Sequence, residues 1–508
     1  MWSAIQSVLK QIDDFVWGVP LMVLILSGGL LLTVRLGLLQ VRKLGLALKW
    51  MVQNEEEGEG EISSFAALCT ALSATIGTGN IVGVATAVCA GGPGALFWMI
   101  VAAFLGMATK YSEGLLAVKY RIVDESGHSL GGPFYYIEKG MGKNWKWLAV
   151  IFALFATIGV PFMVTGPSAS KIFAFFGACV GLFGIGTFSQ VNGISSAVVG
   201  FFDPDKSFAV TIPGLGTYSW VVVIASLVLT FCVAAVIIGG VKRIASVSQV
   251  VVPFMAIIYF IFALALVLFN IKEVPQAIVT IVKSAFNPKA VTGGVVGSML
   301  VAMQNGVARG IFSNEAGLGS APIAAAAAQT KEPVRQGLVS MTGTFIDTIV
   351  ICTLTGLSVV ITGAWQVEGL EGVQVTTYAF QNGLPFSNQF CAAILMICLV
   401  FFAFTTILGW DYYGERCLEY LTGKDEKKIK IYRWLYILAV FIGPYMTVAA
   451  VWTIADIFNG LMALPNMIAL FALSGVVVKE TKRFFEVYTD QKMAKKKSSA
   501  SIKDAAEN

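Results

Sequence analysis

The sequence predicts an all-α polytopic membrane protein of about 11 transmembrane helices: one N-terminal helix, then two inverted five-helix repeats with discontinuous helices 2 and 7. Three observations predict this fold. Apolar types make up 56% of the 508 residues and charged types only 13%, about half the fraction in a soluble domain. Long runs lack charge, and two of them contain glycine-rich interruptions. The same composition excludes a soluble enzyme and a nucleic-acid partner, and predicts that the helices are surrounded by membrane lipid.

The apolar runs give the helices in order. Phe15 to Val34 is long enough to span a bilayer. The uncharged stretch from Ile62 to Thr109 divides into two spans at a Gly-Gly-Pro-Gly turn. The further runs are Trp147 to Phe202, Ser207 to Val241, Ile244 to Ile271, Ala290 to Ala308, Gln336 to Val367, Gly372 to Trp410 and Trp434 to Val478. Because the last run is two spans long, about eleven crossings result.

These runs predict four segments of the chain. Residues 1–62 form the N-terminal helix and an amphipathic linker, 63–270 the first repeat, 271–478 the second repeat, and 479–508 a basic, disordered tail. Residues 147–192 are atypical, since a straight helix across them would be about 70 Å long, more than twice the hydrocarbon core. Pro161, Pro167 and Lys171 therefore predict a break.

The basic residues predict the orientation. Most Lys and Arg residues fall in alternate connections and in the tail from Lys479 onward, and such residues stay on the cytoplasmic side. The N-terminus is therefore expected outside and the C-terminus in the cytoplasm, in the plasma membrane, specifically a bacterial inner membrane.

Two spans, five crossings apart, carry the interruptions. Ala-Thr-Ile-Gly-Thr-Gly-Asn occupies 74 to 80, and a stretch with Asn314, Glu315 and three glycines occupies 308 to 320. A helix that unwinds in mid-membrane frees backbone groups that can hold a substrate and an ion in a buried cavity. The alternative is close helix packing at the Gly79 and Gly83 pair.

The motifs resemble a known family. SATIGTGNIVGVATA at 73 to 87, GGPFYYIEKGMG at 131 to 142, GVARGIFSNEAGLGSAPIA at 306 to 324, VRQGLVSMTGTFIDT at 334 to 348, FAFTTILGW at 402 to 410 and NGLMALPNMIALFALSG at 459 to 475 are similar to the alanine or glycine:cation symporters. The resemblance implies repeats of the leucine-transporter type. It also implies sodium-driven uptake of a small neutral amino acid, alanine or glycine.

The expected substrate site combines residue chemistry with this resemblance. Thr78, Gly79 and Asn80 begin a half-helix, whose free N–H groups and positive dipole end suit a carboxylate. The resemblance adds the amides of Gln190 and Asn314. Thr406 and Trp410 share one helix face, so Trp410 could close the pocket. An interhelical hydrogen bond is the alternative for Gln190, and an interfacial anchor for Trp410.

The co-transported ion is expected to be sodium. Thr405 and Thr406 match the family's hydroxyl pair, facing carbonyls around Ser73 and Ile76. A threonine that bonds back to its own helix is the alternative.

Proton coupling is the rival, with Glu315, Asp347 and Asp456 as candidate carriers. A glutamine-type symporter stays open, and an ion channel is more remote. The sequence contains no phosphate-binding loop motif, which excludes transport driven by ATP hydrolysis in this chain. One loop histidine, His128, and scattered cysteines offer little for an enzyme.

Overall fold

The computed structural model describes residues 2–55, 58–125, 127–157, 187–205, 207, 209–212, 216–286, 290–292, 295–297, 299–445 and 448–507. Helices make up most of this part of the chain, and three short antiparallel strand pairs join them. The break expected at Pro161, Pro167 and Lys171 lies outside the described residues.

The elements of the first half are α1 (Trp2–Val16), α2 (Val19–Arg35), α3 (Leu39–Arg42), α4 (Leu44–Val52), α5 (Ser64–Thr75), η1 (Gly79–Gly83), α6 (Val84–Gly91), α7 (Gly94–Tyr120), β1 (Ile122–Val123), β2 (Ser129–Leu130), α8 (Pro133–Tyr135), η2 (Tyr136–Met141), η3 (Lys143–Trp145), α9 (Lys146–Thr157), α11 (Thr187–Phe202), β3 (Ala209–Ile212), β4 (Gly216–Ser219), α12 (Trp220–Ile237) and α13 (Gly240–Phe269).

The elements of the second half are α14 (Val274–Phe286), β5 (Ala290–Thr292), β6 (Val295–Gly297), α15 (Met299–Asn314), α16 (Ala321–Ala325), α17 (Pro333–Thr344), η4 (Phe345–Cys352), α18 (Thr353–Ile361), η5 (Ala364–Gln366), α19 (Val373–Gly383), α20 (Asn388–Thr422), α21 (Glu426–Ile442), η6 (Gly443–Tyr445) and α22 (Val448–Glu507).

The helices confirm a multi-pass membrane protein. Within the described residues, seven helices are long and apolar enough to cross a bilayer, or eight if the bent pair made by α5 and the following helix is one span. The expected total of about eleven crossings stays a prediction.

The first expected break is present between α5 and η1. Ile76 adopts an extended backbone conformation directly after α5, and the chain bends by 53° before the helix resumes at Gly79. The Asn80 side-chain oxygen accepts a hydrogen bond from the Gly77 amide at 2.9 Å, so a local side chain stabilises the opened turn.

The second expected break separates α15 from α16. Glu315, Gly317 and Gly319 all have positive φ angles of 57°, 88° and 82°. A right-handed helix cannot continue through such residues, and glycine adopts them without a steric cost. The sequence therefore predicted both discontinuous helices correctly.

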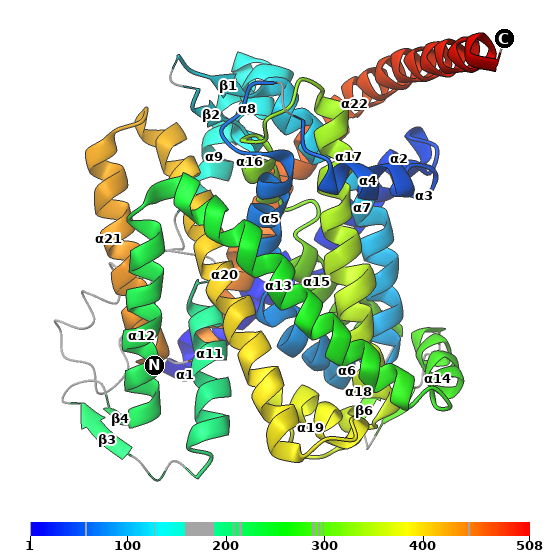
Figure 1. Ribbon diagram of the computed structural model, residues 1–508. Coiled ribbons are helices and arrows are strands. Elements are labelled where there is room, and N and C mark those ends of the chain that lie inside the picture. The colour runs from blue at the N-terminus through cyan, green and yellow to red at the C-terminus, as the bar shows by residue number, and fades with distance from the viewer. Residues whose placement is uncertain are drawn as a thin grey trace.

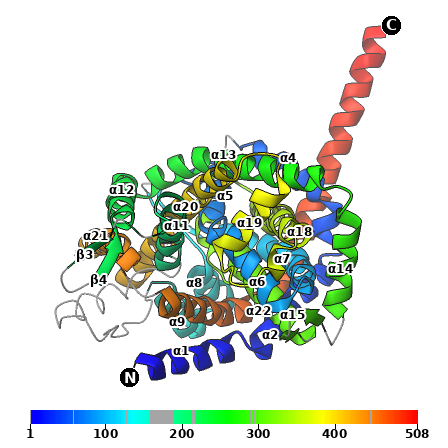
Figure 2. The ribbon, with the colours of Figure 1, turned by 90° about the horizontal axis from the view of Figure 1, so that it is seen from below.

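The two broken helices cross the centre of the molecule (Figure 1). Seen from below, α6, α7, α15 and α18 gather on one side, and α11, α12, α20 and α21 on the other (Figure 2). α7 packs against α15, α16 and α17, whereas α20 packs against α11, α13 and α5. We call the face that carries α4, α8 and the β1–β2 pair the upper face, and the opposite face, with α19 and the β3–β4 pair, the lower face.

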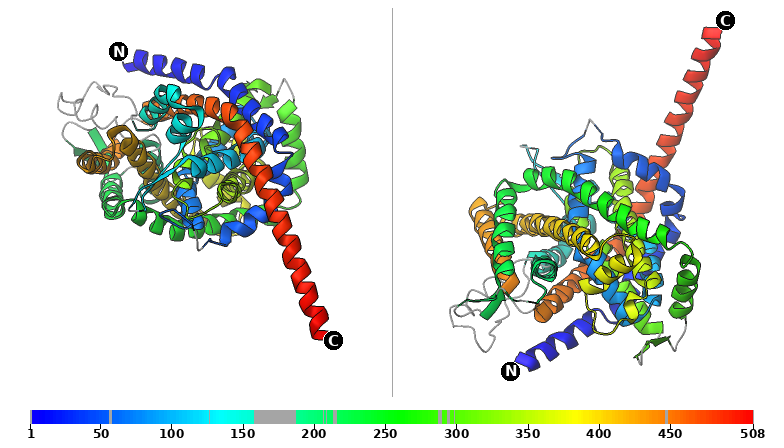
Figure 3. Two further views of the ribbon diagram at one scale, coloured as in Figure 1. Left: turned by 90° about the horizontal axis from the view of Figure 1, so that it is seen from above. Right: turned by 60° about the horizontal axis from the view of Figure 1, so that its bottom comes forward.

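The tail differs from the sequence-based expectation. Residues from Lys479 onward were expected to be disordered, but they continue α22 as a helix to Glu507, which projects away from the bundle (Figure 3). The Lys, Ala and Glu residues of this segment have high helix propensity and extend a helix that already exists, so no new nucleus is needed.

At the upper face, the chain before α5 is joined to the chain after α16. Backbone bridges pair Glu59 with Thr330 and Ile62 with Ala328. Arg121, at the end of α7, donates hydrogen bonds to the carbonyl oxygens of Glu59, Ala328 and Thr330 and of a fourth residue, Ala326. The upper ends of the two broken helices are therefore held as one unit.

We predict that Arg121→Lys destabilises the protein by roughly 2 kcal/mol or more, because a compact ammonium cannot reach carbonyls on both segments and leaves some unpaired. Thermal unfolding of the detergent-solubilised protein would measure the loss. Arg243→Lys, at an exposed position, is the matched control. Equal melting temperatures for the two variants would contradict the role of Arg121.

Candidate functional site

A small cavity lies where the two breaks meet. The space not filled by atoms between its side chains amounts to about 280 Å³. α5, α11, α15, α20 and α22 each contribute to its wall. The lining residues are Ala74, Thr75, Gly77, Gly79, Gln190, Phe312, Glu315, Thr406, Trp410 and Asn459.

Four of the seven predicted substrate residues line this cavity: Gly79, Gln190, Thr406 and Trp410. Trp410 is 5% exposed and packs edge-on against Tyr413, with ring centroids 5.8 Å apart. It lies inside the bundle, which argues against the alternative of an interfacial anchor.

Gln190 connects α11 to the first break. Its side-chain oxygen accepts a hydrogen bond from the Thr78 amide at 3.0 Å. The Thr78 side chain packs toward Gly193, where an added Cβ would lie 2.5 Å from its methyl group. Thr78 does not itself line the cavity: its amide is bonded to Gln190, and its buried hydroxyl has no hydrogen-bond partner among the described residues.

The side chains of Asn80 and Asn314 turn away from the cavity toward Asp347. Asn80 donates to the Asp347 carboxylate at 2.7 Å, and Ser313 and Thr348 donate to its second oxygen at 2.9 and 2.6 Å. Asn314 donates to the Thr348 hydroxyl at 3.0 Å. Asn80 is thus bonded to Asp347 directly and Asn314 through the Thr348 hydroxyl, so both asparagines support the breaks rather than face the cavity.

The residues of the predicted sodium site come together in part. The Thr406 hydroxyl lies 3.2 Å from the Ile76 carbonyl oxygen, across the interface of α5 and α20, and 2.9 Å from the Phe402 carbonyl oxygen of its own helix. Thr405 donates to the carbonyls of its own helix at Phe401 and Phe402, so both threonines make the back-bond given as the alternative, and only Thr406 also reaches the first break. The Ser73 hydroxyl likewise bonds within α5, so Ser73 could offer only its carbonyl.

Several cavity residues were not predicted as substrate contacts. Glu315 is the charged residue of the lining, and its carboxylate accepts from Ser320 at 2.6 Å. Phe312 and Asn459 come from α15 and α22. Gly77 is the tightest point, since a Cβ there would lie 2.5 Å from the Thr406 hydroxyl oxygen. Glu315 and Gly77 belong to the break motifs, but nothing in the sequence pairs Asn459 with them.

Asp456, the remaining candidate for a proton carrier, forms an ion pair with Arg309 at 3.1 Å. Arg309 also lines a wide cavity of about 810 Å³, open to solvent, between α6, α11, α19 and α20 on the lower face.

The upper face is closed by a cluster of charged side chains. Arg416 of α20 donates to Glu61, before α5, at 3.0 Å and to Glu419 at 2.9 Å. His128, in the β1–β2 connection, lies 3.3 Å from Glu61 and 3.2 Å from Glu419. The cluster thus joins the first broken helix to α20. Among the described residues, the lower face therefore carries the wide cavity and the upper face carries this charged cluster.

Two broken helices that meet at one buried polar cavity, inside a bundle of apolar helices, define a secondary transporter. The sequence comparison places it more narrowly. A profile of the sodium:alanine symporter family matches residues 2–501, and the chain belongs to this family. The resemblance seen in the motifs is therefore confirmed.

The relatives agree with this assignment. An uncharacterized transporter of Haemophilus influenzae is 53% identical over 483 residues, which cover 95% of this chain and 96% of that protein. The sodium/alanine symporter AgcS of Methanococcus maripaludis is 47% identical, over 95% and 97% of the two chains. The crystal structure of MhsT in complex with L-phenylalanine matches with a TM-score of 0.52 at 10% identity, over 83% and 98%. MhsT has the leucine-transporter fold, which confirms the predicted fold class.

We predict a pH-dependent contribution of His128 to stability. Hydrogen bonds to Glu419 and Glu61 raise the pKa of His128 from 6.5 to about 9, against the opposing effects of burial and of Arg416. Because the pKa is higher in the folded state, the stabilisation is complete below about pH 6.5 and is lost as the pH rises through about 9. The difference in melting temperature between the wild type and His128→Gln should therefore shrink between pH 6 and pH 10. A constant difference over that range would contradict this assignment.

Proposed function

We propose that this chain couples the uptake of a small neutral amino acid, alanine or glycine, to the entry of sodium by alternating access. The observation that carries the proposal is the juxtaposition of the Thr406 hydroxyl and the Ile76 carbonyl beside a small polar cavity at both helix breaks. Sodium prefers such oxygen ligands. The relative AgcS is named as a sodium/alanine symporter, which supports this choice of ion and substrate.

The cavity suits the two poles of a zwitterion. The Thr78 amide and the Gln190 side chain stand at the start of η1, where the helix dipole favours a carboxylate. Glu315 supplies a negative charge for the ammonium group. The aromatic walls of Phe312 and Trp410 leave room for a small side chain only. Gly79, Asn80 and Asn314 then act chiefly by shaping the breaks.

The proposed orientation follows the basic residues. With the N-terminus outside and the upper face in the cytoplasm, the wide cavity of the lower face opens to the exterior and the Glu61, His128, Arg416 and Glu419 cluster closes the inner side. The structure then corresponds to an outward-facing carrier.

A second candidate is a related carrier with another substrate or ion. Bacillus subtilis relatives at 36% and 37% identity are named as a probable sodium/glutamine symporter, GlnT, and a putative sodium/proton-dependent alanine carrier, YrbD. Uptake into proteoliposomes under separate sodium and proton gradients, with competition by each neutral amino acid, distinguishes these possibilities. Uptake driven by a proton gradient alone would overturn sodium coupling.

We predict that Thr406→Val lowers the apparent sodium affinity at least tenfold, or about 1.4 kcal/mol, because valine keeps the shape and removes the oxygen facing Ile76. Since ion and substrate raise each other's affinity equally, the sodium-induced gain in substrate binding should shrink as well. Thr405→Val is the neighbouring comparison: an equal loss would show that Thr405 turns toward the ion when it binds. Unchanged sodium dependence in both variants would refute the site.

We also predict that Gly77→Ala weakens amino-acid binding at least tenfold even at saturating sodium. Its Cβ would lie 2.5 Å from the Thr406 oxygen and 3.0 Å from the Gln190 oxygen. Gly83→Ala, where a Cβ meets no atom within 4 Å, is the matched control. Isothermal titration with alanine would measure both, and equal affinities would remove Gly77 from the site.

A further inference from the structure

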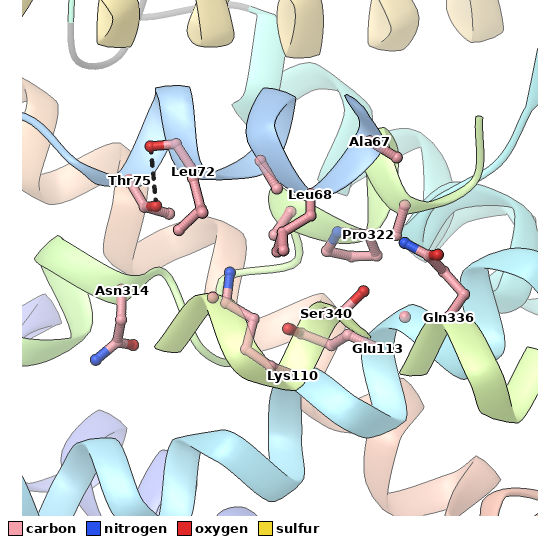
Figure 4. Close-up of a pocket in the computed structure, with 15 residues that line it drawn as sticks. Ala67, Leu68, Leu72, Thr75, Lys110, Glu113, Asn314, Pro322, Gln336 and Ser340 are labelled. Carbon is pink, nitrogen blue, oxygen red and sulfur yellow. Dashed lines mark hydrogen bonds between the residues drawn. The ribbon is translucent and has the colours of Figure 1, made fainter. Parts of the chain in front are cut away.

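A second cavity lies on the other side of α5 from Thr406. It contains about 390 Å³ between α5, α7, α16 and α17, and its polar lining includes Lys110, Glu113, Gln336 and Ser340 (Figure 4). Thr75 lines both this cavity and the smaller one at the breaks. The function proposed above gives this second cavity no role.

Its polar groups are not satisfied by the described part of the protein. Gln336 is fully buried, and neither its amide nitrogen nor its amide oxygen has a hydrogen-bond partner there. Glu113 is fully buried as well, and its Oε2 atom has no partner. Each unsatisfied buried polar atom costs about 1–3 kcal/mol, and more for a charged one. Such a concentration around one cavity points to a polar ligand.

The charges select the sign of that ligand. Three buried carboxylates, of Glu113, Glu315 and Asp347, interact with Lys110, which is itself 3% exposed. Glu315 accepts a hydrogen bond from Ser320, and Asp347 accepts from Asn80, Ser313 and Thr348. The Oε2 atom of Glu113 has no such donor, so a cation is favoured over an anion beside it.

The geometry separates the ammonium group from the free oxygens. In Figure 4 the Lys110 side chain points toward Leu72 and Thr75, whereas the Gln336 amide enters from the opposite end of the cavity. Glu113 lines the same cavity, and its Oε2 atom has no hydrogen-bond partner among the described residues.

We propose that Glu113 Oε2, Gln336 Oε1 and Ser340 Oγ form a second sodium site, distinct from the one at Thr406. Carboxylate, amide and hydroxyl oxygens are hard ligands that suit such a cation. The other oxygen of Glu113 accepts from the Gly317 amide at 3.2 Å and from Asn466 at 2.6 Å. An ion on Glu113 therefore acts directly on a residue that fixes the shape of the second break.

Binding of radioactive sodium to the purified full chain, without amino acid, tests the site. We expect two ions per wild-type chain and one in Glu113→Gln, with the remaining ion bound within about twofold of its original affinity. Thr406→Val should also retain one ion, and the double variant none. Gln336→Leu provides a second route if Glu113→Gln does not fold, and should likewise retain one ion.

Lys110→Gln supplies a readout that a structural role would not produce. Removing a nearby positive charge should raise the sodium affinity of this site at least about threefold, opposite to the effect of Glu113→Gln. The proposal would be overturned if both Glu113→Gln and Gln336→Leu bind as many sodium ions as the wild type. It would also be overturned if replacing chloride with gluconate changes the occupancy of the site, since the site would then bind the anion. A wild-type chain that binds no sodium would overturn the proposed function as well. If Thr406→Val binds fewer sodium ions than the wild type while Glu113→Gln and Gln336→Leu do not, only the second site is overturned.

Discussion

The structure depends on one constraint: backbone groups freed at two helix breaks inside a membrane must find partners within the protein, because lipid offers none. The Asp347 carboxylate is the main hydrogen-bond acceptor shared by the two breaks. It accepts hydrogen bonds from Asn80 beside the first break and from Ser313 beside the second. One buried charge on η4 thereby connects the two broken helices, and its charge is balanced by several donors rather than by a single cation. The sequence left this residue between a coupling role and a structural one, and its contacts favour the structural role.

The same constraint explains why the two faces differ. On the upper face, backbone bridges and Arg121 join the segments that flank α5 and α16, while Arg416 and His128 tie this unit to α20. On the lower face, the corresponding space is a wide cavity. A carrier that works by alternating access must at another stage separate the segments of the upper face and close the cavity of the lower face. The ion pairs of the upper face are themselves largely buried, since the side chains of Arg416, Glu61 and Glu419 are 2–7% exposed, so separating them requires water or new partners for each charge. His128, at the edge of the cluster, is the member that is partly exposed to water.

The motifs did not predict which polar residues stabilise the helix breaks and which line the substrate cavity. Thr78, Asn80 and Asn314 lie where the sequence placed them, but their side chains face the protein and not the cavity. Glu315 faces the cavity, although the sequence indicated it only as a candidate proton carrier. In an unwound segment the direction of each side chain follows individual φ and ψ angles rather than a helical period, so spacing gives no guide to it.

By itself the sequence determined the membrane class, the family and the positions of both breaks, because these depend on hydrophobicity and on local glycine patterns that act over a few residues. Only the tertiary structure decided which groups meet across helices: Gln190 with the Thr78 amide, and Thr406 with the Ile76 carbonyl. It also decided that α22 continues through the tail. Such contacts join residues more than a hundred positions apart, and packing of whole helices fixes them at a precision that no local pattern contains.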